Sequence, residues 1–326
     1  MLLVTGGAGF IGSNVVAALN EAGRTDVAVC DLLGHEGKWR NLAKRQLSDV
    51  VPPAEISVWL QGRKLDAVIH LGAISETTAT DGDLVIETNF RLSMRLFDWC
   101  AATATPFIYA SSAATYGNGG RGFSDDPSIA ALRSLRPLNL YGWSKHLFDL
   151  AVADRAFRGD RLPPQWAGLK FFNVFGPNEY HKGAMASVLT RRFDDIRGGH
   201  AVQLFKSHRE GVADGDLRRD FIYVDDVVRV VMWLLATPAV SGIFNVGTGK
   251  ARSFRDLILS AYAALGLQSN IQYVDMPEAI RDSYQYFTEA RVDRLRGAGY
   301  NGGFTPLEDA VTLYVKGYLE CSDRFR

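Results

Sequence analysis

The 326-residue sequence has no excess of charge of either sign and few residues of the types that build metal sites or disulfides. It contains 36 Lys and Arg against 36 Asp and Glu, so no overall field attracts a nucleic acid or an anionic membrane. The three cysteines, Cys30, Cys100 and Cys321, lack metal-ligand or redox spacing, which is typical of a reducing compartment. The histidines are scattered as well, so the sequence predicts no metal site.

Long apolar runs are also absent. None approaches the roughly 18 residues that would predict a membrane span. The first residues, MLLVTGGAGF, carry no basic segment and their apolar run ends at glycine, so we expect no signal peptide. These absences predict a soluble, cytoplasmic protein that binds neither nucleic acid nor membrane. The hydrophobic content of 47% is sufficient for one large domain or two smaller ones.

Short β-branched runs alternate with longer amphipathic segments in the first half of the chain. The expected strands are MLLVTG, DVAVCDLL, LDAVIHLGA, PFIYASS and LKFFNVFG. The expected helices between them are 11–23, 84–102 and 141–157. This alternation predicts right-handed βαβ units and therefore an α/β fold with a doubly wound parallel sheet, of the Rossmann type.

The alternation becomes irregular after about residue 177. We expect a helix at 185–197 and then a polar surface loop, KSHREGVADGDLRRD. The sequence therefore predicts a dinucleotide-binding domain and a smaller C-terminal substrate domain whose segments interleave with it. Their expected boundaries are 1–173 plus 217–248 for the first domain, and 174–216 plus 249–326 for the second.

The stretch VTGGAGFIGS places Gly6, Gly9 and Gly12 three residues apart, directly after a strand and at the start of a helix. These glycines allow a tight turn, close approach of the backbone to a pyrophosphate, and packing of the helix on the sheet. Asp31 ends the second strand about 20 residues on, where an acidic side chain accepts the ribose hydroxyls of NAD. Lys38 follows and could hold the 2′-phosphate of NADP, so these residues leave the cofactor choice open.

Tyr141 and Lys145 in LYGWSKHLF are spaced i and i+4, which places them on one face of a helix. A nearby ammonium and a positive nicotinamide ring would lower the pKa of the tyrosine from its usual value of about 10. Ser111 and Ser112 end a strand, and such strand ends face the ligand crevice. The three residue types together predict hydride transfer at an alcohol or ketone carbon.

The motifs TGGAGFIGS, SSAATYG, YGWSK, FFNVFGP and RDFIYVDDV together resemble the extended short-chain dehydrogenase/reductase family of nucleotide-sugar enzymes, over nearly the whole chain. YASSAATYG, PLNLYGWSKHLFD, HKGAMASV and SGIFNVGTGKARSF are most similar to the branch that epimerises ADP-glycero-manno-heptose at C6. This resemblance implies an isomerase that passes through a 6-keto intermediate and returns the hydride from bound NADP. It further implies a role in making the heptose of the lipopolysaccharide core. It also implies that the protein forms a homo-oligomer, with a pentamer as the expected form.

The resemblance also assigns site residues. It implies that Ser112, Tyr141 and Lys145 are catalytic and that Lys182 is a second proton-transferring residue. The cofactor site that it implies is lined by Gly6, Gly9, Phe10, Ile11, Gly12, Asp31, Leu32, Lys38, Leu71, Gly72, Ala73, Ser75, Asn89, Tyr141, Lys145, Val174 and Lys182. The implied substrate contacts are Ser112, Asn173, Ala184, Arg191, Phe205, Arg219 and Tyr284. The family tends to use NADP, although Pro53 stands where a cofactor-facing lysine is expected, and NAD is the alternative.

Two other enzyme types share this pattern. A sugar-nucleotide dehydratase needs an acid and a base just after the catalytic serine, and here Ala113, Ala114 and Thr115 follow Ser112. A UDP-hexose 4-epimerase shares the serine, tyrosine and lysine, and is distinguished only by the second domain, where HKGAMASV favours the heptose enzymes. A non-catalytic dinucleotide-binding regulator is disfavoured because both Tyr141 and Lys145 are present.

Overall fold

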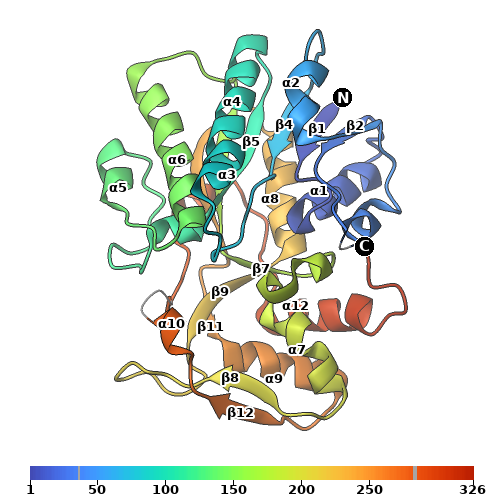
Figure 1. Cartoon of the computed structure of the whole chain (residues 1–326), viewed down its shortest axis with the longest axis vertical. Helices are drawn as coiled ribbons and strands as arrows, with labels where there is room; N and C mark the ends of the chain where they lie inside the picture. The colour runs from blue at the N-terminus through green and yellow to red at the C-terminus, as the bar shows by residue number, and fades with distance from the viewer. Residues whose placement is uncertain (36, 282–284) are drawn as a thin grey trace.

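A computed structural model of the chain describes residues 1–35, 37–281 and 285–326. The larger lobe, in the upper half of Figure 1, contains a seven-stranded sheet in the order β10-β6-β5-β4-β1-β2-β3, with every pair parallel. Its strands are β1 (Leu2–Thr5), β2 (Val27–Cys30), β3 (Asp49–Val51), β4 (Ala67–His70), β5 (Phe107–Ser112), β6 (Trp166–Phe171) and β10 (Gly242–Val246). The predicted doubly wound sheet is confirmed. The direction of winding reverses between β1 and β4, where folds of this type bind their ligands.

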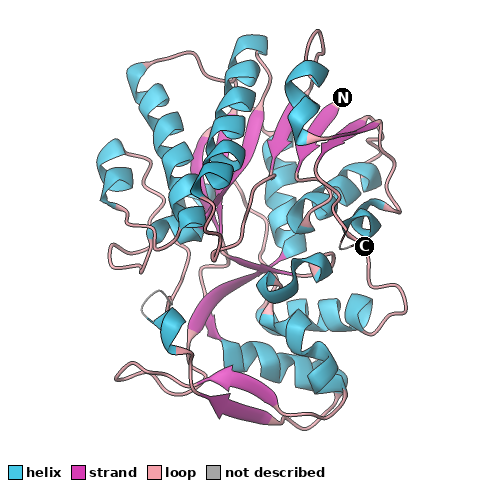
Figure 2. Ribbon diagram, viewed as in Figure 1, coloured by secondary structure: helices cyan, strands magenta, loops and turns pink. Residues whose placement is uncertain are grey.

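Helices cover both faces of this sheet (Figures 1 and 2). Helices α1 (Phe10–Glu21) and α8 (Val224–Ala236) pack against each other and against Val4 on one face. Helices α4 (Leu92–Thr103) and α6 (Leu140–Arg158) cover the other face, which contains Leu3. Because neighbouring residues of one strand are buried on opposite faces, the strands read as continuous apolar runs.

The helix expected at 84–102 is continuous but not regular. It consists of α3 (Gly82–Ile86), one wide turn of π-helix, η3 (Glu87–Arg91), and α4. Such π-turns are often found beside functional sites. This one carries Asn89, whose side chain is discussed below.

The smaller lobe, in the lower half of Figure 1, contains two short sheets with α7, α9 and α12 packed beside them. One sheet has the order β11-β9-β7 and the other pairs β12 with β8. These elements are β7 (Asn173–Phe175), β8 (Val202–Phe205), β9 (Arg218–Tyr223), β11 (Ala251–Ser253), β12 (Ile271–Val274), α7 (Val188–Arg197), α9 (Phe254–Leu265) and α12 (Leu307–Tyr314). Phe175, Leu189, Leu257 and Val311 meet in the core of this lobe.

The helix expected at 185–197 begins later, as α7, at Val188. Ser187 is its N-cap, and the Ser187 hydroxyl accepts a hydrogen bond from the Thr190 amide. The residues before it form a 3-10 helix, η5 (Tyr180–Met185). The remaining helices are η1 (Lys38–Leu42), η2 (Pro53–Glu55), α2 (Ile56–Trp59), η4 (Ala113–Tyr116), α5 (Ile129–Ser134), α10 (Glu278–Arg281), α11 (Asp293–Gly297) and η6 (Val315–Leu319).

The chain crosses between the lobes at several points, and two of these junctions are adjacent. Strand β6 of the large sheet ends at Phe171 and β7 of the small sheet begins at Asn173, so Phe172 alone separates them. Strand β9 ends at Tyr223, and α8 follows directly. Strands β7 and β9 are paired in parallel, with Val174 opposite Ile222, so the junctions lie side by side. The domain boundaries predicted above stay a prediction.

The sequence predicts neither a membrane-spanning segment nor a metal site, and the structure can be examined for both features. None of the helices in the described residues combines the length and apolar character needed to cross a membrane. Within the same ranges, no three His, Cys, Asp or Glu side chains are gathered as metal ligands.

Candidate active site

A cleft of about 750 Å³ lies at the carboxyl ends of the central strands. One wall comes from the large lobe, with the glycine loop and the ends of β2, β4 and β5. The other wall comes from η5, α7 and β9. The cleft therefore brings together side chains from both lobes, between Gly6 and Phe254 in the sequence. A concave site between two lobes is typical of ligand binding.

The glycine loop forms the floor of one end of this cleft. Gly6 has a positive φ of 66°, and a Cβ atom there would lie 2.6 Å from the backbone nitrogen of Gly72. A Cβ on Gly12 would lie 2.1 Å from the Gly6 carbonyl oxygen. Larger residues at either position would therefore displace the loop. Helix α1 begins at Phe10, and the backbone amides at its N-terminus provide an anion site suited to a pyrophosphate.

Asp31 is fixed by three hydrogen bonds at the end of β2. Its Oδ2 atom accepts from the Ala8 amide at 2.9 Å, and its Oδ1 atom accepts from the Leu32 amide at 2.7 Å. Oδ1 also accepts from the Lys38 ammonium at 2.6 Å. The expected acidic residue is therefore tied to the glycine loop, and the expected phosphate-binding lysine is paired with it.

The loop after β4 forms a further part of the cofactor end, with Leu71, Gly72, Ala73 and Ser75 all lining the cleft. Asn89 does not line it and is 0% exposed. Its Oδ1 atom accepts from the Ile74 amide at 2.8 Å, and its Nδ2 atom donates to the Ile74 carbonyl at 2.9 Å and to the Ser144 hydroxyl at 3.0 Å. Asn89 therefore supports the loop from behind, because the π-turn directs its side chain into the core.

Ser112, Tyr141 and Lys145 all line the cleft, as the sequence predicts. Ser112 ends β5, while Tyr141 and Lys145 lie one turn apart on α6. Asn139 is the N-cap of α6, and its side chain accepts from the Gly142 amide at 2.8 Å, which fixes the first turn that carries Tyr141.

Burial shifts the pKa values of both groups on α6. Desolvation lowers the pKa of Lys145 to about 8, against the opposing effect of Asp149. Desolvation raises the pKa of Tyr141, a hydrogen bond with Ser112 lowers it, and Asp149 raises it. The lowered tyrosine pKa expected from the sequence is thus not found in the protein alone, because the cost of burying the phenolate exceeds the help from its neighbours.

Lys182 lies on η5 and reaches the same cleft from the other wall. Its ammonium lies 5.6 Å from the centre of the Phe10 ring, in a cation–π arrangement. Desolvation lowers the pKa of Lys182, and Glu179 raises it. The neighbouring His181 also lines the cleft, and burial, followed by the charges of Lys38 and Lys182, lowers its pKa to about 4.

Most of the expected substrate contacts lie at the far end of the cleft. Asn173, Ala184, Arg191 and Arg219 line it, as do Phe10, Ile11 and Val174 from the expected cofactor set. Leu32 and Phe205 do not line it, and Leu32 is 66% exposed. Tyr284 lies outside the described residues.

Sequence reasoning missed several residues of the cleft. Phe221 and Phe254 form an edge-to-face pair with ring centres 5.3 Å apart, and the Arg219 guanidinium lies 5.7 Å from the Phe254 ring. His181 was also missed, although it precedes Lys182 directly. The aromatic pair has no local signal, because β9 and α9 meet only through the fold.

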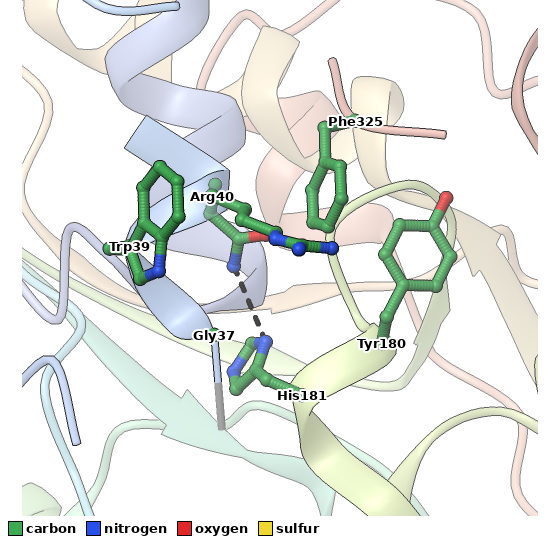
Figure 3. A pocket seen from close by; sticks show the side chains of 7 residues that line it. Gly37, Trp39, Arg40, Tyr180, His181 and Phe325 are labelled. Carbon is green, nitrogen blue, oxygen red and sulfur yellow. Dashed lines mark hydrogen bonds between the residues drawn. The ribbon is translucent and has the colours of Figure 1, made fainter. Parts of the chain in front are cut away.

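A second pocket of about 380 Å³ lies beside the cofactor end. Figure 3 shows Arg40 extending toward Phe325 and Tyr180, with Trp39 on the other side. The Asn41 amide lies 3.3 Å from Nδ1 of His181, and His181 lines both pockets. His181 therefore lies between the cleft and the second pocket, and Phe325, near the C-terminus, lines the second pocket.

Comparison with known proteins agrees with this geometry. Residues 2–247 match the sequence model of the NAD dependent epimerase/dehydratase family. A protein of Nitratidesulfovibrio vulgaris (strain DP4) is 50% identical over the full length of both chains, and one of Fusobacterium nucleatum is 44% identical, also over both full lengths. Both are named ADP-L-glycero-D-manno-heptose-6-epimerase.

Solved structures show the same similarity. The ADP-L-glycero-D-manno-heptose-6-epimerase of Helicobacter pylori has a TM-score of 0.79 at 27% identity, covering 97% of this chain and 95% of that one. A UDP-glucose 4-epimerase of Thermus thermophilus in complex with NAD has a TM-score of 0.73 at 25% identity, covering 97% of each chain. The chain therefore belongs to the NAD-dependent epimerase/dehydratase family and, within it, to the group of ADP-L-glycero-D-manno-heptose-6-epimerases.

Proposed function

We propose that this protein inverts the configuration at C6 of ADP-glycero-manno-heptose, from D-glycero-D-manno to L-glycero-D-manno, through a 6-keto intermediate. The names of relatives at 44–50% identity over the full chain support this substrate. The observation that carries the mechanism is that two separate proton-transferring groups, Tyr141 on α6 and Lys182 on η5, line one cleft. Inversion through a planar ketone requires hydride return to the opposite face of C6. After the ketone has turned, its oxygen lies in a new position and needs a proton donor there.

The cleft fits a nicotinamide dinucleotide. A Cβ at Gly6 or Gly12 would collide with the backbone of this loop, so both glycines preserve the loop shape that would let a pyrophosphate reach the N-terminus of α1. Asp31, which lines the same cleft, would accept the hydroxyls of a ribose. When bound, the cofactor would accept the hydride from C6 and later return it. Everything else in the reaction falls to side chains of this protein.

Tyr141 is the proposed base for the first half of the reaction. Its phenolate would remove the proton of the C6 hydroxyl, while Ser112 would hydrogen-bond the same oxygen. Burial disfavours that phenolate, so the Lys145 ammonium and the positive charge of a bound nicotinamide ring must together stabilise it. Asp149 helps to keep Lys145 protonated, since it raises the pKa of that lysine.

Lys182 is the proposed acid for the second half. C6 lies outside the sugar ring, so rotation about the C5–C6 bond presents the other face of the ketone without release of the nucleotide. The oxygen then points away from Tyr141 and needs a proton donor elsewhere in the cleft. Desolvation of Lys182 lowers its pKa toward the range in which a lysine exchanges protons near neutrality. The competing role for Lys182 is to bind the diphosphate.

The far end of the cleft would hold the sugar nucleotide. Arg191 and Arg219 are suited to the diphosphate, because a guanidinium can make two parallel hydrogen bonds to it. Asn173 and Ala184 would contact the sugar between these arginines and Ser112. Phe205, which does not line the cleft, remains a proposal from the family resemblance. Tyr284 remains one too, because it lies outside the described residues.

For the cofactor we propose NADP, with NAD as the alternative. An acidic residue after the second strand normally repels a 2′-phosphate. Here Lys38 neutralises Asp31 at 2.6 Å, which removes most of that repulsion. The family pattern supports NADP, whereas Pro53, which does not line the cleft, offers no second cation.

Other parts of the proposal rest on the family resemblance alone. They are a cytoplasmic location, a homo-oligomer with a pentamer as the expected form, and a role in supplying heptose for the lipopolysaccharide core. Sedimentation velocity of the purified protein would measure the oligomer directly.

The deciding experiment is incubation with ADP-D-glycero-D-manno-heptose, followed by NMR of the C6 configuration. Appearance of the L-glycero epimer supports the proposal. The alternative activity, a UDP-hexose 4-epimerase, predicts an unchanged heptose and inversion at C4 of UDP-glucose under the same conditions.

A further inference from the structure

Glu179 is a buried carboxylate immediately before η5, the 3-10 helix that carries Lys182. It is 1% exposed. It does not line the active-site cleft, and within the described ranges it makes no direct ion pair. A buried charge of this kind is costly unless hydrogen bonds compensate for the loss of water.

Four donors converge on this carboxylate. Oε2 accepts from the Ser187 amide at 2.7 Å, and Oε1 accepts from the Ser187 hydroxyl at 2.7 Å and the Thr190 hydroxyl at 2.6 Å. A longer contact of 3.4 Å joins Oε1 to the Gly176 amide. All four contacts are donors, which is what an ionised carboxylate requires. The carboxylate also sits at the N-terminus of α7, where the helix dipole favours a negative charge.

These contacts close the segment around Lys182. Gly176 precedes η5 and Ser187 follows it, so both ends of the turn are held by one side chain. The backbone carbonyl of Glu179 also accepts from the Lys182 amide at 3.0 Å. Thr190 in turn contacts the Tyr314 hydroxyl at 2.8 Å, which fastens the turn to α12. Glu179 thus fixes where Lys182 can reach.

Lys182 shares the cleft with charged and titratable groups from both walls. They are His181 on its own helix, Arg191 on α7, Arg219 on β9, Asp31, Lys38 and Glu76 at the cofactor end, and Tyr141 and Lys145 on α6. Glu179 lies three residues before Lys182 on the same turn, and its backbone carbonyl accepts from the Lys182 amide at 3.0 Å. Its charge raises the pKa of that lysine against the larger opposing effect of desolvation.

We propose that Glu179 is the positioning residue of Lys182: its carboxylate fixes the turn that presents the lysine and supplies the negative charge that keeps the lysine protonated for transfer to the substrate. The second half of this statement rests on the proposed function of Lys182, whereas the first does not. Glu179 itself touches neither substrate nor cofactor. It acts only through Lys182.

Glu179→Gln separates charge from shape. The amide keeps one oxygen for the Ser187 amide, and the hydroxyls of Ser187 and Thr190 can turn to accept from its nitrogen. The variant should therefore fold and retain dinucleotide. The matched control is Thr190→Val, which removes one contact to the carboxylate and preserves its charge.

The readout is the pH dependence of Lys182 acetylation, followed by peptide mass spectrometry on the folded protein. Without the negative charge the pKa of Lys182 falls, so the acetylation curve of Glu179→Gln should shift to lower pH. The exposed Lys64 in the same digest should titrate unchanged, and Thr190→Val should keep the curve of the parent protein. Because the proposed acid must be protonated, the alkaline limb of the turnover profile should move to lower pH as well.

This test is independent of the proposed function, because acetylation needs no turnover. An unchanged acetylation curve in Glu179→Gln would overturn the inference and leave Glu179 a purely structural residue. If Lys182→Met retained full turnover, the role of Lys182 in catalysis would fail instead, and a shifted acetylation curve would still assign Glu179 its effect on the lysine.

Discussion

The Nζ atom of Lys38 lies 2.6 Å from Oδ1 of Asp31 at the carboxyl end of β2. Both side chains line the cofactor end of the cleft, with exposed fractions of 20% and 9%. The pair joins the two residues on which the proposed choice of NADP over NAD depends. Its ammonium must partly leave the carboxylate if it is to bind a 2′-phosphate.

Lys38→Ala should weaken the binding of NADP more than that of NAD. A hydrogen bond to a charged group contributes about 1.5–3 kcal/mol, so NADP affinity should fall roughly tenfold to a hundredfold. Without its partner Lys38, the Asp31 carboxylate would then repel the 2′-phosphate as well. Fluorescence titration with both cofactors measures the difference, with Lys64→Ala as a surface control. Equal losses for NAD and NADP would instead identify an NAD enzyme.

Turnover should require only catalytic amounts of cofactor. The hydride that leaves C6 returns to the same carbon, so no net oxidation accompanies epimerisation. Absorbance at the wavelength of the reduced nicotinamide should stay flat during steady turnover, while NMR records the product. Reduced cofactor released in proportion to product would contradict the mechanism.

Tyr141→Phe should fold and bind dinucleotide but lose most activity. The change removes only the phenolic oxygen that is proposed to take the proton of the C6 hydroxyl, and general-base steps contribute about 10²–10⁴-fold. The loss should appear in kcat, with KM for the sugar nucleotide little changed. Near-normal turnover would remove Tyr141 from the reaction.

Lys182→Met separates proton transfer from phosphate binding. Methionine preserves most of the length of the side chain but carries neither charge nor proton. We expect a fall in kcat of a similar order, about 10²–10⁴-fold, with little change in substrate affinity. A large loss of affinity with kcat preserved would make Lys182 a phosphate ligand and rule out the two-base mechanism.

Lys170→Met should destabilise the fold. The Lys170 ammonium lies 2.8 Å from Oδ2 of Asp149, and both side chains are 0% exposed. Removing one partner of a buried pair leaves an uncompensated charge and costs about 3–5 kcal/mol of unfolding free energy. Urea unfolding measures it against Lys316→Met, whose exposed pair with Glu320 should contribute less than about 1 kcal/mol. If Lys170→Met lowered the unfolding free energy by as little as Lys316→Met, the buried pair would not contribute to stability as expected.

The parts of the site that the sequence predicts are those with local signals. Gly6, Gly9 and Gly12 fall on one loop, and Tyr141 and Lys145 on one helix face, so spacing alone determines their neighbours. Ser111 and Ser112 followed from the rule that parallel strands end at the ligand crevice, and the family resemblance singled out Ser112. The doubly wound sheet followed in the same way from the alternation of strands and helices.

The rest depends on contacts between distant segments. Asn89 was expected in the cofactor site, and one wide helical turn places it behind the loop of that site, where it bonds to Ile74. The pKa of Tyr141 was expected to fall beside an ammonium and a bound nicotinamide ring. In the protein alone burial raises this pKa, and burial cannot be read from a spacing of four residues. The role of Glu179 was not predicted, because its carboxylate meets Ser187 and Thr190 only when η5 folds back onto α7.

The junctions between the lobes have a mechanical consequence. The chain passes between the lobes from β6 to β7, from β9 to α8 and from β10 to β11, and strands β7, β9 and β11 belong to one small sheet. The hydrogen bonds of that sheet therefore tie these crossings to one another. A relative movement of the lobes has to bend this sheet, so it meets more resistance than movement about one flexible linker would.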